Sequence, residues 1–456
     1  MQSLAQLFYL HGIGYEYTKY TGEHVVFDES TRRSALSCCG IDCTDTDTIN
    51  QLNFALDAGT WLTLLPNVSL IESDEPFLRV RVDERLLSRG CELRLPSLDI
   101  VVSRENLHEL SVTGDYRFND IRYLEVALPL PDMPIGYHDA VITVADQEAH
   151  SELWIMPKQC FTVDDKKRLG VSIQLYSLFN AHGLGIGDFA DLASLMREAA
   201  ANGMDYILLN PLHLLFEHSP ERASPYSPNS RALLNPLYIA LSLCEDAKDN
   251  LALEKLLNEK PQGTDTYIDY TSVSDFKYQL FSCLYHHFRE TASVERKAQF
   301  EAFCLTHKHS LATLVVGDNE YASYLQWQAH LQLNLCQQIA NECGMDIGLI
   351  NDLAVGCAGD GSEYRSQDEL FSHGANVGAP PDPWAEQGQN WGLPALNPQK
   401  LSKDNFAFYR SLIRANMEDV GGLRIDHVMA IRRLWWCFDN QGQQDGCYVY
   451  YPFEHL

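Results

Sequence analysis

The sequence predicts a multidomain α/β protein in which a β-sandwich precedes β/α units of the barrel type. The chain has 456 residues, and at roughly 100–200 residues per domain this length corresponds to two to four domains. Apolar and polar residues alternate between about residues 77 and 157, as they do in half-buried strands. After about residue 166, short apolar runs instead alternate with helical stretches, which is typical of β/α units.

The first two domains are expected at residues 1–58 and 59–160. Residues 1–58 mix short apolar stretches with turn-rich segments, which predicts a small helical unit. Residues 59–160 contain apolar runs with a period of two, and turn residues separate these runs. Two of the runs are Leu78, Val80 and Val82, and Leu124, Val126 and Leu128. This pattern predicts an antiparallel β-sandwich of about 90 residues.

Residues 161–456 are expected to form the β/α units. The predicted strands comprise residues 171–176, 206–209, 346–350 and 422–426. A helix is predicted from Phe189 to Ala201, and acidic, helix-like segments at about residues 240–340 predict a helical insertion between barrel units.

Charge and cysteine content exclude several classes of protein. Lys plus Arg total 34 and Asp plus Glu total 62, so the net charge is 34 − 62 = −28, and we expect neither nucleic acid nor a membrane as a partner. The 13 cysteines are odd in number and form no C-x-x-C pair, which argues against a disulfide framework or a zinc ribbon. Reduced thiols and the lack of a leader-like or spanning segment predict a cytoplasmic protein.

Two motifs that suggest a ligand have simpler explanations. Gly183, Gly185 and Gly187 lie between a strand and a helix, but the dinucleotide fingerprint G-x-G-x-x-G needs its third glycine one residue later. Asp188 is better explained as the N-cap of the following helix. His286 and His287 lie in an amphipathic helical stretch beside Tyr285 and Phe288, so we expect structural histidines and no metal site.

The segment from Gly421 to His427 is the most informative for chemistry. Alternation along a strand places Arg424 and Asp426 on the same side. A guanidinium favours the ionised form of a neighbouring carboxylate, as a carboxylate nucleophile requires. At the carboxyl end of a barrel strand, such an aspartate would face the active-site mouth. A structural ion pair explains the same spacing.

Three loops combine aromatic and polar residues in a way that suits a glycan. They are Pro380–Trp384, Gly388–Pro394 and Ser224–Arg231, the last expected directly after a barrel strand. Aromatic faces pack against the CH faces of sugars, while carboxylates and amides bind hydroxyl groups. One such loop alone is equally consistent with a packed surface loop, but three at one end of a barrel favour a glycan site.

These residues carry a family resemblance, which runs from about Leu169 to the end of the chain. The chain resembles the 4-α-glucanotransferases, also called amylomaltases or disproportionating enzymes, and most closely their larger bacterial form with N-terminal extensions. The matching segments are Ser224–Arg231, Asn351–Gly356, Val377–Asp382, Gly388–Pro394 and Leu423–His427. The resemblance implies a (β/α)₈ barrel that moves α-1,4-glucan segments between maltooligosaccharides without a metal or an organic cofactor.

The resemblance also implies residue roles. Asp426 matches the nucleophile that forms a covalent glycosyl-enzyme, Arg424 matches the residue that keeps it ionised, and Asp352 matches a carboxylate that hydrogen-bonds the sugar. The other residues expected to bind substrate are Ser224, Tyr226, Asp382, Trp384, Gln389, Trp391 and His427. The reaction is then retaining, and the 4-hydroxyl of a second glucan releases the bound segment.

One departure from the family limits these expectations. The family takes its acid/base glutamate and a third essential aspartate from strands that follow the nucleophile's strand, and Leu456 comes about 30 residues after Asp426, before either motif. Glu454 is too close in sequence to Asp426 to match that glutamate. We therefore expect about four strands of an incomplete barrel. We expect this chain to be inactive alone and its partner to be the other half of the barrel. The alternatives are a glycan-binding protein without turnover and a hydrolytic α-amylase relative.

Overall fold

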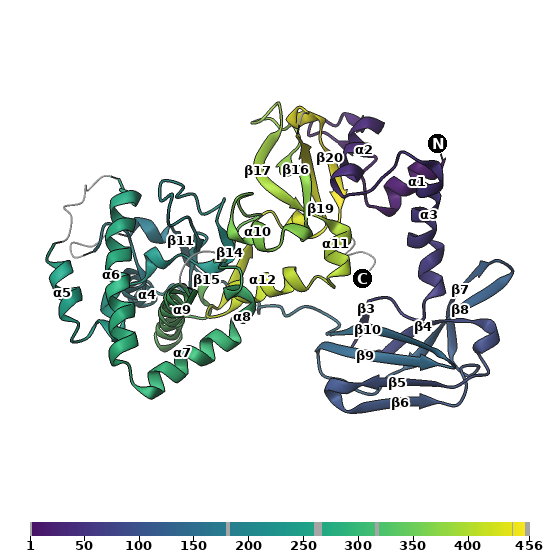
Figure 1. The fold of residues 1–456 in the computed structure, drawn as a ribbon, viewed down its shortest axis with the longest axis horizontal. Coiled ribbons are helices and arrows are strands. Elements are labelled where there is room, and N and C mark those ends of the chain that lie inside the picture. The colour runs from purple at the N-terminus through teal and green to yellow at the C-terminus, as the bar shows by residue number, and fades with distance from the viewer. Residues whose placement is uncertain (1, 179–182, 260–266, 315–318, 440, 452–456) are drawn as a thin grey trace.

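The computed structural model describes residues 2–178, 183–259, 267–314, 319–439 and 441–451. The chain is an α/β multidomain protein, as predicted, and it forms three lobes (Figure 1). We call them the two-sheet lobe at the lower right, the parallel-sheet lobe at the left and the upper lobe. Within the described residues, no helix is both long enough and apolar enough to cross a bilayer.

The two-sheet lobe contains two sheets that share one hydrophobic core. The larger sheet comprises, in spatial order, β3 (Val68–Glu72), β10 (Gln147–Met156), β9 (Gly136–Val144), β5 (Cys91–Leu95) and β6 (Ile100–Arg104). The smaller sheet comprises β4 (Phe77–Asp83), β8 (Ile121–Pro129) and β7 (Ser111–Phe118). Leu78, Val80 and Val82 are fully buried, because alternation along β4 directs every second side chain into this core.

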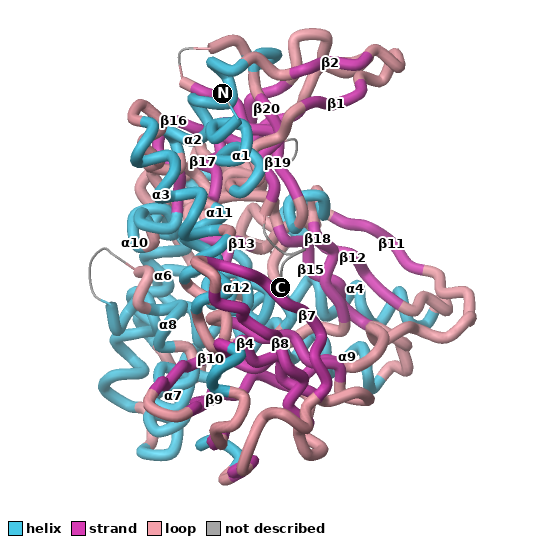
Figure 2. Tube along the Cα trace, turned by 90° about the vertical axis from the view of Figure 1, so that its right-hand side faces the viewer, coloured by secondary structure: helices cyan, strands magenta, loops and turns pink. Residues whose placement is uncertain are grey.

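The parallel-sheet lobe is built on four parallel strands. In spatial order they are β11 (Gly170–Ile173), β12 (Tyr206–Leu209), β15 (Gly348–Leu353) and β18 (Gly422–Ile425), as Figure 2 shows. Three predicted ranges were wrong at their ends: β11 stops at Ile173 because Leu175–Ser177 forms a 3₁₀ turn, β15 runs from Gly348 to Leu353, and β18 stops at Ile425. Helix α4 (Phe189–Ala201) has its predicted bounds, and Asp188 caps it as predicted.

A helical segment lies between β12 and β15 and packs against α4. Its described residues include a short hairpin, β13 (His213–Leu214) and β14 (Ser230–Leu234), and then five α-helices. These are α5 (Leu251–Leu257), α6 (Tyr270–Thr291), α7 (Val294–Thr306), α8 (Lys308–Leu311) and α9 (Asn319–Glu342). Leu280 and Leu284 of α6 are fully buried, in agreement with their predicted helical spacing.

The upper lobe contains an antiparallel sheet that was not predicted. Its strands, in spatial order, are β17 (Gln389–Leu396), β16 (Phe371–Ala379), β19 (Arg433–Phe438) and β20 (Cys447–Tyr450). The predicted loop Gly388–Pro394 was therefore wrong from Gln389 onward, because these residues pair with β16. The glycines and polar residues of β16 weaken its strand propensity, so only pairing with β17 and β19 reveals it.

The N-terminal segment packs on this sheet, so residues far apart in sequence share one core. The segment contains α1 (Gln2–Leu10), β1 (Glu16–Thr18), β2 (His24–Val26), α2 (Glu29–Cys38) and α3 (Thr46–Leu56). Leu7 and Leu36 belong to the same buried cluster as Trp435 and Trp436. The remaining helices are α10 (Ser362–Ser366), α11 (Pro398–Lys403) and α12 (Ala407–Met417), and α12 leads directly to β18.

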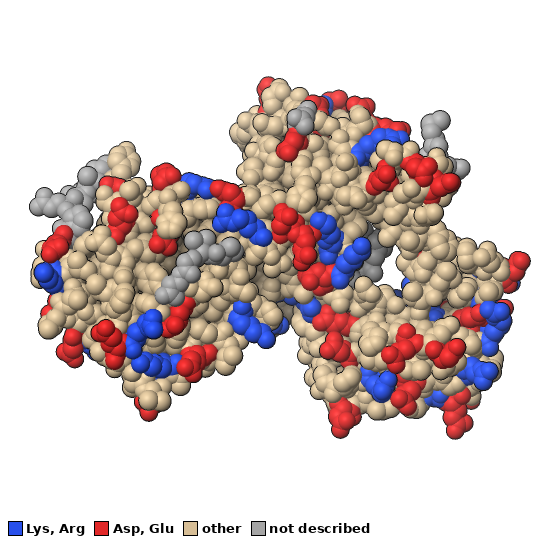
Figure 3. Space-filling model, viewed as in Figure 1, with Lys and Arg blue, Asp and Glu red and all other residues tan. Residues whose placement is uncertain are grey.

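On the face shown in Figure 3, charged side chains are spread out rather than gathered in one place. Figure 3 shows acidic side chains on all three lobes of the face in view, with Lys and Arg side chains between them. This distribution is consistent with a net charge of −28 and offers no broad basic surface on that face.

Candidate active site

Arg424 joins two carboxylates at the carboxyl ends of β15 and β18. The two strands are parallel, and their register sets Asp352 opposite Arg424. The Arg424 guanidinium donates from Nη1 to Oδ1 of Asp352, and from Nη2 to Oδ1 of Asp426 at 2.7 Å. Arg424 and Asp426 thus lie side by side, as strand alternation predicts. The third member, Asp352, comes from a strand 72 residues earlier.

The two carboxylates differ in their exposure to solvent. The Asp352 side chain is 5% exposed and the Asp426 side chain is 30% exposed. Burial raises the pKa of Asp352 above its ordinary value, although the hydrogen bond and charge of Arg424 act in the opposite direction. The ionised form of Asp352 therefore depends on Arg424, while Asp426 remains within reach of a ligand.

Tyr226 extends this cluster from the turn that precedes β14. Its hydroxyl lies 3.5 Å from Oδ2 of Asp352, at the long end of the hydrogen-bond range. Ser224 lies in the same turn, where its carbonyl accepts from the N–H of Ser227 at 3.3 Å. The prediction that this segment follows a barrel strand directly was wrong, because β13 intervenes and Ser230 and Arg231 belong to β14.

β17 places two further predicted residues beside the end of β18. The Trp391 and His427 rings meet edge to face, with centroids 5.2 Å apart and planes at 85°. Trp391 Nε1 donates to Oε1 of Gln389 at 2.9 Å, so the amide and the indole form a unit. His427 follows Asp426 directly and has a left-handed backbone, with φ of 48°. Burial lowers the pKa of His427, which favours the neutral ring.

Asp382 and Trp384 lie in the connection between β16 and β17. The backbone N–H groups of Trp384 and Ala385 donate to Oδ1 of Asp382 at 2.8 and 2.7 Å, so this carboxylate stabilises its own turn. The Trp384 side chain is 92% exposed. In the described part of the chain, no hydrogen bond or ion pair links these two residues to Arg424 or Asp426.

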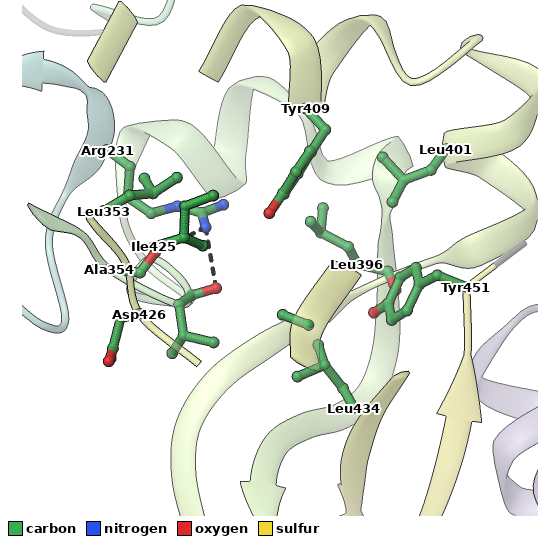
Figure 4. Close-up of a pocket in the computed structure, with 12 residues that line it drawn as sticks. Arg231, Leu353, Ala354, Leu396, Leu401, Tyr409, Ile425, Asp426, Leu434 and Tyr451 are labelled. Atoms are coloured by element: carbon green, nitrogen blue, oxygen red, sulfur yellow. Dashed lines mark hydrogen bonds between the residues drawn. The ribbon is translucent and has the colours of Figure 1, made fainter. Parts of the chain in front are cut away.

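A pocket with mainly apolar walls lies on the other side of Asp426, between the parallel sheet and the upper lobe (Figure 4). Its walls include Leu353, Ile425, Leu396, Leu401 and Leu434. Figure 4 shows the Asp426 carboxylate turned away from the centre of this pocket, towards which the Tyr409 hydroxyl points. The pocket therefore lies behind the carboxylate cluster.

A buried ion pair that sequence reasoning missed supports this end of the sheet. Arg231 donates to Oε1 of Glu363 through Nε and Nη2 at 2.9 and 2.6 Å, and both side chains are 2% exposed. Arg231 Nη1 also donates to the carbonyl oxygens of Ala354 and Val355 at 3.3 and 3.1 Å. These carbonyls follow Asp352, so the pair fixes the chain where β15 leaves the sheet. Glu363 belongs to none of the motifs, and no sequence pattern pointed to it.

The remaining predictions concern His286, His287 and Glu454. His286 is exposed on α6, and its Nδ1 lies 2.7 Å from the carbonyl oxygen of Ser282. Neither His286 nor His287 belongs to the one cluster of possible metal ligands among the described residues. Glu454 lies outside the described residues.

Chemically, the cluster combines one partly exposed and one buried carboxylate with a guanidinium between them. A tyrosine hydroxyl, an indole and an amide lie at its edge. Such a site can bind a neutral, hydroxyl-rich ligand and present an ionised carboxylate to it.

The sequence matches a known family. The family model described as 4-alpha-glucanotransferase matches residues 173–316 and 315–456. A Haemophilus influenzae protein described as 4-alpha-glucanotransferase is 31% identical over 425 residues, which cover 80% of this chain. A Mycobacterium tuberculosis protein with the same description is 28% identical over 509 residues and matches 100% of this chain. The chain spans 60% of the Haemophilus protein and 69% of the mycobacterial protein.

The fold of this chain is similar to those of solved amylomaltases. An amylomaltase from Corynebacterium glutamicum superposes with a TM-score of 0.82 and 26% identity, over 99% of this chain and 68% of that protein. An amylomaltase from Streptococcus agalactiae in complex with acarbose has a TM-score of 0.53 and 20% identity, over 63% of this chain and 65% of that protein. The second likeness concerns the fold alone.

Proposed function

The chain belongs to the 4-alpha-glucanotransferase family, and from this premise we propose that it carries the nucleophile half of an enzyme that transfers α-1,4-glucan segments between maltooligosaccharides. The observation that carries the proposal is the contact of one guanidinium, that of Arg424, with both Asp352 and Asp426. This contact supports a carboxylate nucleophile beside a second carboxylate that binds the substrate.

In the first step, Asp426 attacks the anomeric carbon of the donor glucan. The bond from that carbon to the 4-oxygen of the leaving glucan breaks, and an acid protonates this oxygen. Arg424 holds Oδ1 of Asp426 at 2.7 Å, and we assign the attack to Oδ2. The guanidinium favours the ionised nucleophile and sets its direction.

In the second step, the 4-hydroxyl of an acceptor glucan attacks the same carbon from the face that the first glucan left. Its proton passes to the group that served as acid, and the Asp426 ester bond breaks, so the configuration is retained. This cycle needs two carboxyl groups and no metal ion or organic cofactor.

The substrate-binding residues fall into two groups in this proposal. Asp352, Tyr226 and Ser224 accept or donate hydrogen bonds at the subsites nearest Asp426. The second group supplies aromatic faces and polar groups along the glucan: Asp382, Trp384, Gln389, Trp391 and His427. The exposed Trp384 ring and the Gln389–Trp391 unit support this assignment, since sugar CH faces pack on indole rings.

The acid that protonates the leaving oxygen is not Asp352 in this proposal. A retaining enzyme needs a second carboxyl group about 5–5.5 Å from the nucleophile. Asp352 accepts from Arg424 and faces the Tyr226 hydroxyl, and both contacts favour its ionised form over the protonated form of an acid. We propose that further strands pairing along β18 supply the acid and complete the barrel, and that the 456 residues alone do not complete the transfer cycle.

Products from maltotriose test this proposal. A longer version of the protein that supplies the acid should convert maltotriose into glucose and longer glucans, with no increase in reducing ends. Growth of reducing ends would instead indicate a hydrolase, and binding of maltotriose without products would indicate a glycan-binding protein. The family match favours neither alternative.

The odd number of cysteines supports a cytoplasmic location as part of the same proposal.

A further inference from the structure

Two histidines and a glutamate from separate elements converge on the far side of β18 from Asp426. His307 is the C-cap of α7, His330 lies in α9, and Glu418 is the C-cap of α12, four residues before β18 begins. One nitrogen from each ring and one carboxylate oxygen lie within 4.8 Å of one another. His307 Nε2 is 3.0 Å from Oε2 of Glu418.

The Nδ1 atoms of both rings are already engaged. His307 Nδ1 lies 3.0 Å from the carbonyl oxygen of Phe303, and His330 Nδ1 lies 3.0 Å from Oδ2 of Asp419. Metal-binding histidines characteristically donate one ring N–H to a carbonyl or a carboxylate, which leaves the other nitrogen as the ligand. A ring that keeps its proton on Nδ1 has the lone pair on Nε2 free for a metal, and at His307 the metal would replace the proton now between Nε2 and Oε2 of Glu418.

A chain of hydrogen bonds along α9 orients the Asp419 carboxylate. Asn334 Nδ2 donates to Oδ1 of Asp419 at 2.7 Å, and Gln338 Nε2 donates to Oδ1 of Asn334 at 2.6 Å. His330, Asn334 and Gln338 are spaced by four residues, so they share one face of the helix. Both oxygens of Asp419 are thus held in place, which in turn fixes the plane of the His330 ring.

The surroundings favour a cation that is partly shielded from water. The Phe303 ring stacks on His307 with centroids 4.1 Å apart, and the His330 side chain is only 10% exposed. Glu418 is 39% exposed, so an ion can enter past its side chain. His307 and Glu418 each cap the C-terminus of a helix, where the helix dipole favours positive charge.

We propose that His307, His330 and Glu418 bind one zinc ion, with Nε2 of each ring and the Glu418 carboxylate as ligands and Asp419 behind His330. Ligand atoms about 2.0–2.2 Å from zinc are about 3.4 Å apart in a tetrahedron. One nitrogen of each ring and one Glu418 oxygen now lie within 4.8 Å of one another, so closing this spacing needs relative shifts below about 1.5 Å. Imidazole ligands select zinc over calcium or magnesium, which prefer oxygen ligands alone.

The site is structural rather than catalytic. It links α7 and α9 of the helical segment to the turn between α12 and β18, at the opposite end of β18 from Asp426. The two carboxylates, Glu418 and Asp419, compensate the charge of a divalent ion when both rings are neutral. The competing arrangement has protons in place of the metal, with each ring paired to one carboxylate.

Zinc binding to the metal-stripped 456-residue chain tests the proposal by isothermal titration calorimetry. The wild-type chain should bind one zinc ion per molecule, and His330→Gln and Glu418→Gln should each weaken binding by more than about 100-fold. Asp419→Asn should weaken it by about 10–100-fold, because it removes only the hydrogen-bond partner of a ligand. The matched control is His286→Gln, an exposed histidine on α6, which should leave binding unchanged.

Cobalt substitution separates this site from the 13 free cysteines. Bound Co²⁺ should give visible d–d bands of a tetrahedral nitrogen and oxygen site, without the near-ultraviolet charge-transfer band of a thiolate ligand. Zinc should also raise the thermal unfolding temperature of the wild type but not of His307→Gln. This variant removes a ligand that is less buried than His330. No zinc binding by the wild type, a thiolate band, or equal affinity in the ligand variants would each overturn the site and leave the proton-paired arrangement.

Discussion

The Arg424 guanidinium lies 2.7 Å from the Asp426 carboxylate and uses its second amino group to hold Asp352. Planar, forked donors are what allow one side chain to serve two carboxylates from two strands. Asp352 is the more buried of the two, and burial raises its pKa while Arg424 acts in the opposite direction. The two hydrogen bonds of Arg424 hold both carboxylates in fixed positions.

Arg424→Lys in an active, longer version of the protein should reduce kcat/KM for maltotriose disproportionation by about 10–150-fold. The ammonium group keeps the charge but cannot make both contacts, and a charge-assisted hydrogen bond contributes about 1.5–3 kcal/mol. Arg414→Lys on the exposed face of α12 is the control and should retain wild-type kinetics. A kcat/KM within twofold of wild type for Arg424→Lys would contradict the bridging role.

Asp426→Asn in the same longer version should abolish turnover and leave glucan binding largely intact. The amide has nearly the same shape but cannot act as the nucleophile. Maltotriose disproportionation and maltooligosaccharide affinity, measured on the same sample, check the two halves of this expectation. A residual rate above about a hundredth of wild type would place the nucleophile at another residue.

Glu363→Gln should lower the free energy of unfolding of the 456-residue chain by about 3–5 kcal/mol, because it leaves the Arg231 charge buried without its partner. Urea denaturation followed by circular dichroism measures this change. Asp360→Asn breaks the exposed pair with Arg222, whose side chains are 63% and 39% exposed, and should cost less than about 1 kcal/mol. Equal effects of the two substitutions would mean that the Arg231–Glu363 pair is not essential to the fold.

His213 should make stability fall as the pH is lowered. Burial, followed by the charge of Arg231, lowers the pKa of His213 from 6.5 to about 3, so the unfolded chain binds a proton that the folded chain excludes. This contribution to stability is complete above pH 6.5 and is lost as the pH falls from 6.5 towards 3.

Between about pH 7 and pH 5, the wild type should therefore lose about 2 kcal/mol more stability than His213→Gln. The glutamine carbonyl can accept the Ala354 N–H that His213 Nε2 now accepts at 3.1 Å. Urea denaturation of both proteins at the two pH values checks the difference. If the two proteins lose the same free energy of unfolding between these pH values, then His213 binds its proton equally well in the folded and unfolded chains.

The 456 residues alone should give no glucan ladder from maltotriose, because loss of general acid–base assistance costs about 10²–10⁴-fold in rate. Thin-layer chromatography after prolonged incubation of the purified chain checks this, with Asp426→Asn as the control for contaminating enzyme. A ladder from the wild type that Asp426→Asn does not produce would mean that a carboxyl group within these residues serves as the acid. Its first candidate would then be Asp352, whose pKa is raised by burial.

Local patterns in the sequence determined the elements whose side chains repeat with a regular period. The alternation of Leu78, Val80 and Val82 predicted β4, the helical run after Asp188 predicted α4, and both lie where the sequence placed them. Arg424 and Asp426 meet for the same reason, since residues two apart on a strand share a side. These outcomes need only the geometry of one segment.

Only the tertiary structure decided which segments meet. Asp352 reaches Arg424 through the parallel register of β15 and β18, and Trp391 reaches His427 because the unpredicted strand β17 pairs with β16. The N-terminal helices share a core with Trp435 and Trp436. The period of the apolar residues reveals which face of a helix or strand is apolar, but many other elements can bury that face equally well. The choice among them depends on strand register and packing over the whole chain.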